Sequence, residues 1–497
     1  MFYIVLLLRN MPPDGLHPSL PPLLYGTHAS CRRMQISACR RLFHFPPLWN
    51  TRGMGSVLSR KGCTMTEQKF IRPKGSNTRW VISSLLCSMI ILNYFDRVAV
   101  SIAAPDLQQS FGLTAFEIGL VFSIYNYAYT FMQLPVGYLL DRRGVGPIVR
   151  IGLIFWSILT ILFAFIQGKL LLYIVRFFTG MASAAAFPAA SKATANWFPP
   201  HERGLANAMF DSSAKLSNVI GAPLVALIIS IYDWRAAVLS IGIINIIFTF
   251  IFFRYYAEPK AHKKVSEREL TYINDNRANS SESYPYPFFY SLKKLFSSRK
   301  VWGVTIGFTG YGYTFNLLLM WLPSFFKEQF ELDLLTTSLL TAIPWLIAAL
   351  VGIIVGGWLV DILIRKGVEE NKVYRRIIVT GLTLGLVFLG SIFTTNPILS
   401  MVFITIGLAG ISATAPIGWS IVSKIVPPGM TGNMSAIINF ANNLFGGIIA
   451  SLLTGYIIEV TGSFDLAFII AGIVLVIGIF FYTVVLGKIE PIQMEDQ

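Results

Sequence analysis

The sequence Asn93-Tyr94-Phe95-Asp96-Arg97 places an acid and a base inside a stretch, residues 80–104, that is otherwise apolar or small. About 20 such residues cross the hydrocarbon core of a bilayer, so this stretch is predicted to be a transmembrane helix. A charge near mid-depth costs roughly 2.5–3.5 kcal/mol on insertion scales, and both side chains should therefore face a protein interior or a water-filled cavity. Two interpretations are open: an ion pair that locks helices together, or groups that line a functional cavity.

The composition of the chain is that of a membrane protein. Of its 497 residues 54% are hydrophobic and 13% are charged, and the mean hydropathy is +0.61. A soluble globular protein has a smaller fraction of apolar residues. The net charge of +15 comes from Lys and Arg between apolar segments, which is a topology signal and does not indicate nucleic acid as a partner. The four cysteines have neither metal-ligand nor disulfide spacing, and we expect no metal and no cofactor.

Twelve apolar segments follow one another along the chain, and one long polar, basic stretch divides them six and six. We therefore predict an all-α polytopic membrane protein with twelve transmembrane helices in two pseudo-symmetric six-helix bundles. The predicted parts are an N-terminal extension at residues 1–79, the first bundle at 80–256, a cytoplasmic linker at 257–300, the second bundle at 301–487 and a tail at 488–497.

The N-terminal extension differs from the rest of the chain. Residues 1–64 are rich in Pro and Arg and contain the single acid Asp14. Two interpretations are open: an organellar transit peptide, or untranslated sequence upstream of a true start at Met54 or Met65. Beyond it, basic residues collect in the linker and in alternate loops, so the positive-inside rule predicts that both termini face the cytoplasm.

The two halves also repeat a loop pattern. Residues 137–144 close the second apolar segment as residues 357–367 close the eighth. Such repetition is typical of transporters that rock two bundles about a site at the membrane midplane.

The loop at residues 137–150 resembles the signature between the second and third helices of the major facilitator superfamily, and residues 357–376 resemble a degenerate copy. Within that superfamily, residues 93–97, 176–180 and 197–204 are similar to the anion:cation symporter family, which includes bacterial glucarate, hexuronate and galactonate permeases, sialin and the vesicular glutamate transporters. The resemblance implies a monomeric secondary transporter of the bacterial inner membrane. It also implies conformational gating by signature residues, namely Gly137, Asp141, Arg142, Gly144, Asp361 and Arg365.

Charged residues of the first half are the main site candidates. Tyr94 and Arg97 share one face of the first helix, whereas Asp96 lies about 100° round from Arg97. A carboxylate held apart from its neighbouring cation can load and unload a proton, which suits proton coupling. The resemblance implies that Arg176 lines the site, where its paired donors suit a substrate carboxylate. Tyr129 matches a site tyrosine of the family, either as a hydroxyl donor or as packing.

The first half also departs from the family pattern. Ser183 stands where the sugar-acid permeases carry a glutamate, and Ala214 stands where they carry a glutamine. The fifth segment instead contains Asp211 and Lys215, four residues apart on one face. They form either a self-neutralising pair or a rebuilt pocket, in which Lys215 binds substrate and Asp211 takes part in proton coupling.

Uncharged polar residues inside the spans of the second half are further candidates for binding substrate hydroxyls. Each could equally make an interhelical hydrogen bond. They are Asn316, Trp419, Ser420, Asn439 and Asn443, together with their neighbour Asn442.

These observations predict proton-coupled symport of a small organic anion, a sugar acid or another carboxylate. The partners expected are that anion, the proton and the lipid bilayer. An exchanger or uniporter is the alternative, because the second acid of the family is missing. All five histidines lie outside the spans and no catalytic set is visible, so we expect no enzyme. A channel and a non-transporting receptor on the same fold are the other classes considered.

Overall fold

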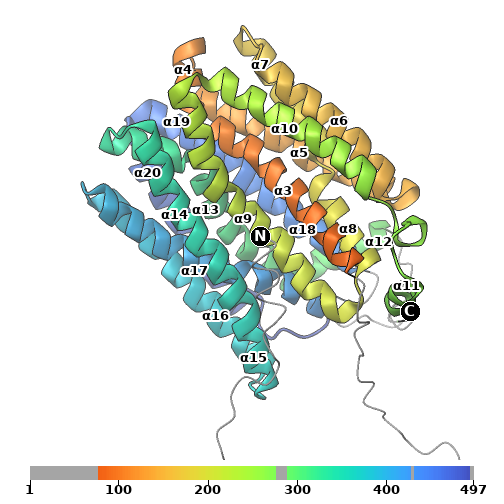
Figure 1. Cartoon of the computed structure of the whole chain (residues 1–497). Coiled ribbons are helices and arrows are strands. Elements are labelled where there is room, and N and C mark those ends of the chain that lie inside the picture. Colours follow the sequence, from red (N-terminus) through yellow and green to blue (C-terminus); the bar gives the residue numbers. More distant parts are fainter. Residues whose placement is uncertain (1–76, 276–287, 427–429, 493–497) are drawn as a thin grey trace, which may run out of the picture. The chain divides into compact units, whose positions relative to one another are not determined.

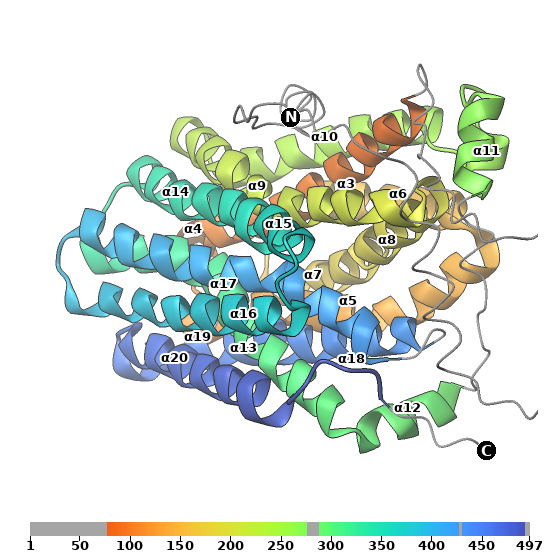
Figure 2. The ribbon, with the colours of Figure 1, turned by 90° about the horizontal axis from the view of Figure 1, so that it is seen from below.

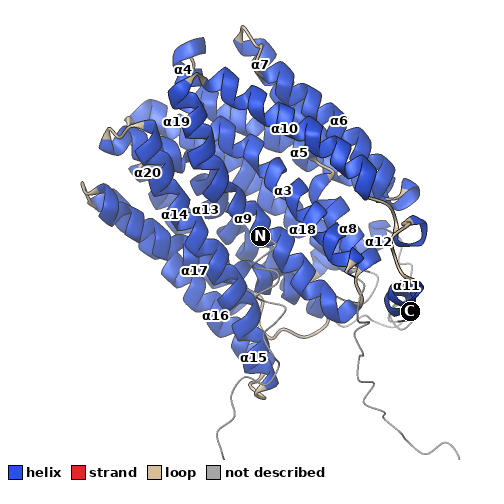
Figure 3. Ribbon diagram, in the orientation of Figure 1, coloured by secondary structure: helices blue, strands red, loops and turns tan. Residues whose placement is uncertain are grey.

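The computed structural model describes residues 77–275, 288–426 and 430–492 (Figure 1). Throughout these ranges the chain forms helices joined by short loops, and they contain no strand (Figure 3). The two interpretations of residues 1–64 concern a segment that lies outside the described residues.

Ten helical segments of the described chain are long and apolar enough to cross a bilayer. Two further helices of span length run beside them, α5 (Ala115–Arg143, 29 residues) and α13 (Arg299–Phe330, 32 residues). Most of α13 is buried against other helices, so few of its side chains need to suit lipid. With these two helices, the twelve predicted spans are confirmed in the described part of the chain.

The first bundle contains six spans and one short helix. Its fourth span consists of two helices, α7 and α8, which meet at Ala184 and Ala185. Local signals set the helix starts: Thr114 and Glu117 form a capping box at α5, and Asp233 caps α10. Besides α5, the helices are α3 (Thr78–Ile102), α4 (Ala104–Phe111), α6 (Val145–Phe163), α7 (Lys169–Ser183), α8 (Ala186–Trp197), α9 (Pro200–Ile231) and α10 (Trp234–Tyr255).

The second bundle contains the other six spans, several of which change helix type part-way. A wide π-helical turn occurs in η3 and in η5. A Cβ at Gly356 of η3 would lie 2.6 Å from the carbonyl oxygen of Ala413, so only glycine lets this turn approach α17 so closely. Besides α13, the helices are α14 (Leu334–Ile353), η3 (Ile354–Leu359), α15 (Val360–Arg365), α16 (Glu370–Gly385), η4 (Leu386–Phe393), α17 (Pro397–Ile425), α18 (Thr431–Asn442), η5 (Asn443–Ile449), α19 (Ala450–Thr461), α20 (Asp465–Phe480) and η6 (Phe481–Val485).

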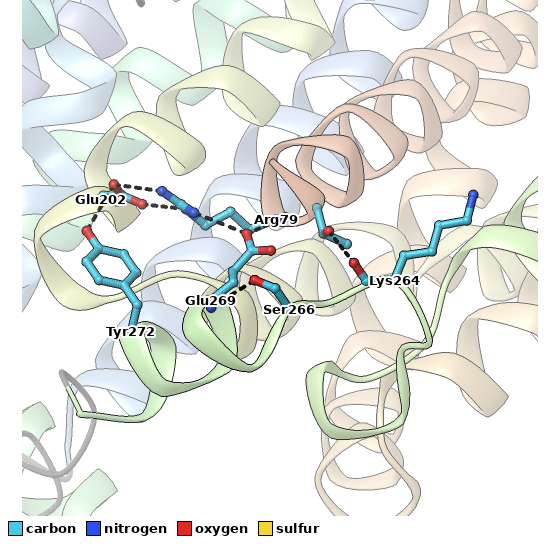
Figure 4. A network of polar contacts seen from close by, with 7 residues as sticks. Arg79, Glu202, Lys264, Ser266, Glu269 and Tyr272 are labelled. Carbon is cyan, nitrogen blue, oxygen red and sulfur yellow. Dashed lines mark hydrogen bonds and ion pairs between the residues drawn. The ribbon is translucent and has the colours of Figure 1, made fainter. Parts of the chain in front are cut away.

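The linker between the bundles contains η1 (Pro259–Ala261), α11 (Glu267–Asp275) and α12 (Phe288–Ser297). Figure 4 shows how α11 is attached to the first bundle. Arg79, at the start of α3, donates from Nε to Glu202 at 2.8 Å and from Nη1 to Glu269 at 3.1 Å. The Tyr272 hydroxyl donates to Glu202 at 3.2 Å. These four residues, here called the linker cluster, fasten α11 to the first turns of α3 and α9.

The two bundles pack against each other through α3 with α13, α5 with η5 and α19, and α9 with α14. In Figure 2 the helices α3, α6, α9 and α10 lie along one side, and α16, α19 and α20 lie along the other. We call the end of the molecule that holds α4 the α4 end, and the end that holds α11 and α15 the linker end (Figure 1).

Two hydrogen bonds join the bundles near the α4 end. There the Ser101 hydroxyl donates to the carbonyl oxygen of Met320 at 2.6 Å, and the amide of Phe116 donates to the Glu459 carboxylate at 2.9 Å. Along α5, contacts with the second bundle pass from α19 near Ala115 to α18, where Asn439 donates to Gln133 and Phe440 packs on Phe131. The bundles therefore remain in contact along much of α5.

Candidate functional site

The guanidinium of Arg97 lies in a cage of three tyrosine rings. Its Cζ lies 4.9 Å from the ring centre of Tyr94, 4.9 Å from that of Tyr125 and 4.7 Å from that of Tyr129. Tyr94 precedes Arg97 by three residues on α3, and the two other rings stack on α5 with their planes 13° apart. Nη1 donates to Asn126 at 3.4 Å, whereas Nε is buried without a hydrogen-bond partner. Ring faces therefore hold this cation.

Arg176 on α7 contacts one of the same rings. Its Cζ lies 4.5 Å from the ring centre of Tyr125, its side chain is 2% exposed, and its Nε and Nη2 have no hydrogen-bond partner. Neither Arg97 nor Arg176 takes part in the ion pairs found among the described residues. The two buried cations thus keep free N–H donors beside a shared ring.

Asp96 faces away from the tyrosine cage. Its carboxylate accepts hydrogen bonds from the indole N–H of Trp156 and, at 3.1 Å, from the hydroxyl of Thr160, both on α6. It is 4% exposed. Nearby on α10, both amide atoms of the fully buried Asn245 lack a partner. The separation of Asp96 from Arg97 expected from the helical spacing is therefore observed, and the partners of Asp96 are neutral donors.

Asp211 and Lys215 form the ion pair that their spacing on α9 predicted, with Nζ 3.0 Å from Oδ2. The two ends differ in environment, because the side chain of Lys215 is 2% exposed and that of Asp211 is 30% exposed. The Lys215 ammonium lies 3.5 Å from where a Cβ of Gly352, on α14, would be. Lys215 therefore lies between the bundles, and Asp211 is the more accessible partner.

The candidates in the second bundle are dispersed. Asn316 donates to the carbonyl oxygen of Gly312 on its own helix at 2.9 Å. Asn439 donates to Gln133 of α5 at 3.2 Å, across the two bundles. Asn443 donates to Asn439 at 2.9 Å, which agrees with the prediction that these two share a face. Interhelical hydrogen bonding, one of the two interpretations, is thus observed for Asn439.

Trp419 and Ser420 follow each other on α17. The ring of Trp419 lies 5.2 Å from that of Phe308 in an edge contact, and the residue is 37% exposed. The Ser420 hydroxyl donates to the carbonyl oxygen of Pro416 at 2.9 Å. Trp419 is consequently the candidate of the second bundle with the most accessible surface.

A family model described as Major Facilitator Superfamily matches residues 86–451, well over half of the chain. The chain belongs to the Major Facilitator Superfamily. Its family and its relatives are transporters, so this protein is a membrane transporter and not an enzyme.

This chain aligns with two curated relatives over almost the whole length of each relative. An "Uncharacterized transporter YybO" of Bacillus subtilis (strain 168) is 59% identical over 430 residues, which are 86% of this chain and 98% of the relative. A "D-galactonate transporter" of Escherichia coli O6:H1 is 30% identical over 425 residues, which are 84% of this chain and 98% of the relative. The predicted resemblance to the galactonate permeases is confirmed.

A solved superfamily structure has the same fold. It is a bacterial homolog of the human lysosomal transporter Spinster, in an inward-facing and occupied conformation. It aligns with a TM-score of 0.65 at 16% sequence identity and covers 82% of this chain and 97% of that chain. At this identity the match supports the fold alone.

The superfamily signature lies where α5 joins α6. Gly144 has φ of 79° and ψ of 173°, a backbone conformation open almost only to glycine. The turn directs the first amide of α6, that of Val145, to the Glu258 carboxylate at 3.1 Å. The other oxygen of Glu258 accepts from Asn196 at 3.1 Å. Gly144 and Glu258 together therefore tie the linker end of α6 to α8 and to the chain beyond α10.

The remaining signature residues are less constrained. Nothing lies within 4 Å of where a Cβ of Gly137 would be, so sterics do not require glycine there. The Cζ of Arg142 lies 5.0 Å from the ring centre of Tyr138, and Asp361 is exposed. The side chains of Asp141 and Arg365 lie outside the described part of the structure.

Several residues of the site were not found from the sequence. Tyr125 is the most important of them, and its spacing of four from Tyr129 was an available signal. Trp156 and Thr160, also four apart, could have marked a polar face of the third span. Glu258 gave no signal, because it reads as an ordinary linker charge.

Proposed function

We propose that this protein carries a small organic anion, a sugar acid or another carboxylate, together with protons by alternating access. The observation that supports this most is the pair of buried guanidiniums of Arg97 and Arg176, which keep unpartnered N–H donors beside one tyrosine ring. Burying a cation without an opposite charge is unfavourable. A planar guanidinium offers parallel donors that match a carboxylate, so a bound anion supplies both the missing charge and the missing acceptors.

The substrate contacts we propose divide between the bundles. Tyr94, Arg97, Tyr129 and Arg176 recognise the anionic group. Lys215 adds positive charge once Asp211 is displaced or protonated. Neutral side chains of the second bundle contact the rest of the substrate, and these are Asn316, Trp419, Ser420, Asn439 and Asn443.

The linker contains Lys263, Lys264, Lys293 and Lys294. By the positive-inside rule we assign the linker end and both termini to the cytoplasm of a bacterial plasma membrane. Rearrangement of the signature residues Gly137, Asp141, Arg142, Gly144, Asp361 and Arg365 accompanies the switch to the outward-facing state.

Asp96 is the proton-coupling residue in this proposal, with Asp211 as the second acid. Asp96 is buried among neutral donors, so it is charge-balanced only by groups further away. A carboxylate in this setting can change its protonation state during a transport cycle. Asp96 lies on the side of α3 that faces α6, outside the tyrosine cage, and interacts electrostatically with Arg176, so the proton site and the anion site can influence each other.

An exchanger or uniporter without proton coupling is the second candidate function. One observation favours it: the position of the family glutamate holds Ser183, whose hydroxyl is hydrogen-bonded to that of Tyr125 at 2.7 Å. No acid therefore adjoins the described arginines through this position, and the anion site can load without releasing an internal proton.

Uptake by proteoliposomes distinguishes the two functions. The purified full-length protein is reconstituted, a pH gradient is imposed, and labelled D-galactonate and D-glucarate are supplied in turn. We expect accumulation above equilibrium that a protonophore abolishes, and equal counterflow with or without the gradient. Counterflow without accumulation would establish the exchanger or uniporter. Neither activity with either compound would remove these sugar acids as substrates.

Replacement of Asp96 tests the proton site directly. Asp96→Asn keeps the size and hydrogen-bonding shape of the side chain but cannot ionise, so we expect proton-driven accumulation to disappear while counterflow continues. Asp333→Asn is the matched control, because Asp333 caps α14 at the α4 end and asparagine caps a helix equally well. If Asp96→Asn still concentrates substrate and Asp211→Asn does not, the assignment of the two acids is reversed.

A further inference from the structure

One aromatic ring contacts both Arg97 and Arg176, the two arginines of the proposed anion site. The ring centre of Tyr125 lies 4.9 Å from Cζ of Arg97 and 4.5 Å from Cζ of Arg176. Tyr94 and Tyr129 also contact Arg97, yet Tyr125 is the one ring in the described structure that contacts the two guanidiniums together. The relative placement of the two cations therefore depends on Tyr125.

Packing fixes both the ring and the backbone of Tyr125. The residue is fully buried, and its ring stacks against that of Tyr129 with centres 6.1 Å apart. A Cβ at Gly180 would lie 2.3 Å from the carbonyl oxygen of Tyr125, so this glycine brings α7 directly onto α5 at this residue. Gly180 lies one turn from Arg176, and the same packing thus places the ring and the guanidinium together.

The hydroxyl of Tyr125 is hydrogen-bonded to the hydroxyl of Ser183. The two oxygens are 2.7 Å apart, and the Ser183 hydroxyl also lies 3.1 Å from the carbonyl oxygen of Gly180, which can only accept. A serine hydroxyl has one proton. When that proton goes to Gly180, Tyr125 is the donor to Ser183, and its own proton is then not available to a substrate.

We propose that Tyr125 is a positioning residue that holds the guanidiniums of Arg97 and Arg176 at the spacing the anion requires, and that Ser183 sets the angle of its ring. This inference rests on the proposed function of the two arginines as the anion site. A ring face attracts a cation without supplying a hydrogen-bond acceptor in the plane of the guanidinium. Tyr125 therefore contacts both cations while Nε of Arg97 and Nε and Nη2 of Arg176 stay without a hydrogen-bond partner, whereas a carboxylate in its place would accept from such donors.

The first test compares Tyr125→Leu with Tyr129→Leu and with Tyr127→Leu. Tyr127 lies on the same helix but is 49% exposed and packs on Phe131, so it is the matched control. KM and the maximal rate of D-galactonate and D-glucarate uptake are measured in proteoliposomes. We expect Tyr125→Leu to raise KM at least tenfold with a maximal rate within threefold of the original, Tyr129→Leu to raise it less, and Tyr127→Leu to change neither.

A second measurement is independent of transport. Phenylglyoxal modifies arginine, and the rate at each arginine of the full-length protein is followed by peptide mass spectrometry. Loss of the shared ring in Tyr125→Leu should speed modification of both Arg97 and Arg176. Loss of the Tyr129 ring should speed modification of Arg97 alone. Failure of both sugar acids as substrates would remove the proposed substrate class, whereas this comparison would still decide the role of Tyr125.

The hydroxyl pair is tested by a double-mutant cycle, which also decides the matter if Tyr125→Leu fails to fold. Tyr125→Phe and Ser183→Ala each remove one partner of the same hydrogen bond. We expect each to raise KM about threefold and the double variant to raise it no further. Multiplied effects would show that the two hydroxyls act separately. Unchanged KM together with unchanged phenylglyoxal rates in Tyr125→Leu would overturn the proposal.

Discussion

The linker cluster and the anion site both bury arginine, but they satisfy it in opposite ways. Arg79 is 4% exposed and binds two carboxylates, those of Glu202 and Glu269. Arg176 is 2% exposed and lies against a tyrosine ring, with two of its nitrogens unpartnered. Burial is nearly equal in the two places, so the partners make the difference. An arginine saturated with carboxylates fastens helices, whereas one held by a ring keeps its donors for a ligand.

The two places are alike in which helices each arginine connects. The linker cluster joins α3, α9 and α11, which all belong to the first bundle or to the linker helix attached to it (Figure 4). None of these contacts needs to break when the bundles move relative to each other. Arg97 and Arg176, the anion site of our proposal, are likewise held by helices of the first bundle, namely α3, α5 and α7.

The largest effect that we expect comes from Arg79→Met. This change strands the carboxylates of Glu202 and Glu269 in a buried position, and breaking a buried ion pair by removing one partner costs about 3–5 kcal/mol. The melting temperature of the detergent-purified protein should therefore fall strongly. Substrate affinity of the surviving folded protein should be unchanged.

Two further variants sharpen this comparison. Arg79→Met combined with Glu202→Gln and Glu269→Gln should be more stable than Arg79→Met alone, because no stranded charge remains. Arg176→Met should lower the melting temperature less than Arg79→Met, since Arg176 interacts with the Asp96 carboxylate electrostatically but forms none of the salt bridges found in the described residues. If Arg176→Met destabilised the protein as much as Arg79→Met, the two sites would not differ in the way we infer.

Much of this fold could be predicted from the sequence, because the bilayer itself imposes the signal. Length and apolarity define each span, and helical spacing alone placed Tyr94 beside Arg97 and Asp211 beside Lys215. The linker cluster could not be found in this way. Glu269 lies on the short helix α11 and contacts Arg79, 190 residues earlier in the chain, through tertiary packing, so no local pattern links the two residues.

The second effect in order of size concerns Asp211 and Lys215. The two ends of this pair differ, because the Lys215 side chain is 2% exposed and that of Asp211 is 30% exposed. Asp211→Asn leaves an ammonium buried between the bundles, and we expect a loss of about 2–3 kcal/mol. Lys215→Met leaves a carboxylate that water reaches in part, so its loss should be about 1 kcal/mol after solvent screening.

Melting temperatures of the two single variants and of Asp211→Asn with Lys215→Met check this order. The double variant should be more stable than Asp211→Asn alone, because it leaves no unpaired charge. Equal losses for the two single variants would mean that both ends of the pair are solvated, and Lys215 would then be available to substrate without displacement of Asp211.

The anion site itself was only partly predictable, and the reason is again physical. The sequence predicted Arg97, Arg176 and Tyr129 as members of one site. It did not predict that Tyr125 contacts both arginines, because that contact depends on how closely α7 approaches α5 at Gly180. The hydrogen bond from Asn439 to Gln133 likewise joins helices of different bundles. Helical periodicity relates only residues of one helix, so it could not predict this contact.

The smallest expected effect tests the claim that planar donors, and not charge alone, make the anion site. Arg176→Lys keeps a positive charge but loses the fork of parallel N–H donors. We expect affinity for D-galactonate or D-glucarate, measured by binding or as KM in proteoliposomes, to fall about tenfold, which corresponds to about 1.4 kcal/mol. Arg235→Lys is the matched control, because Arg235 lies in the first turn of α10 at the α4 end and packs on Trp234 away from the site. Unchanged affinity in Arg176→Lys, with the melting temperature lowered instead, would return Arg176 to the same structural class as Arg79.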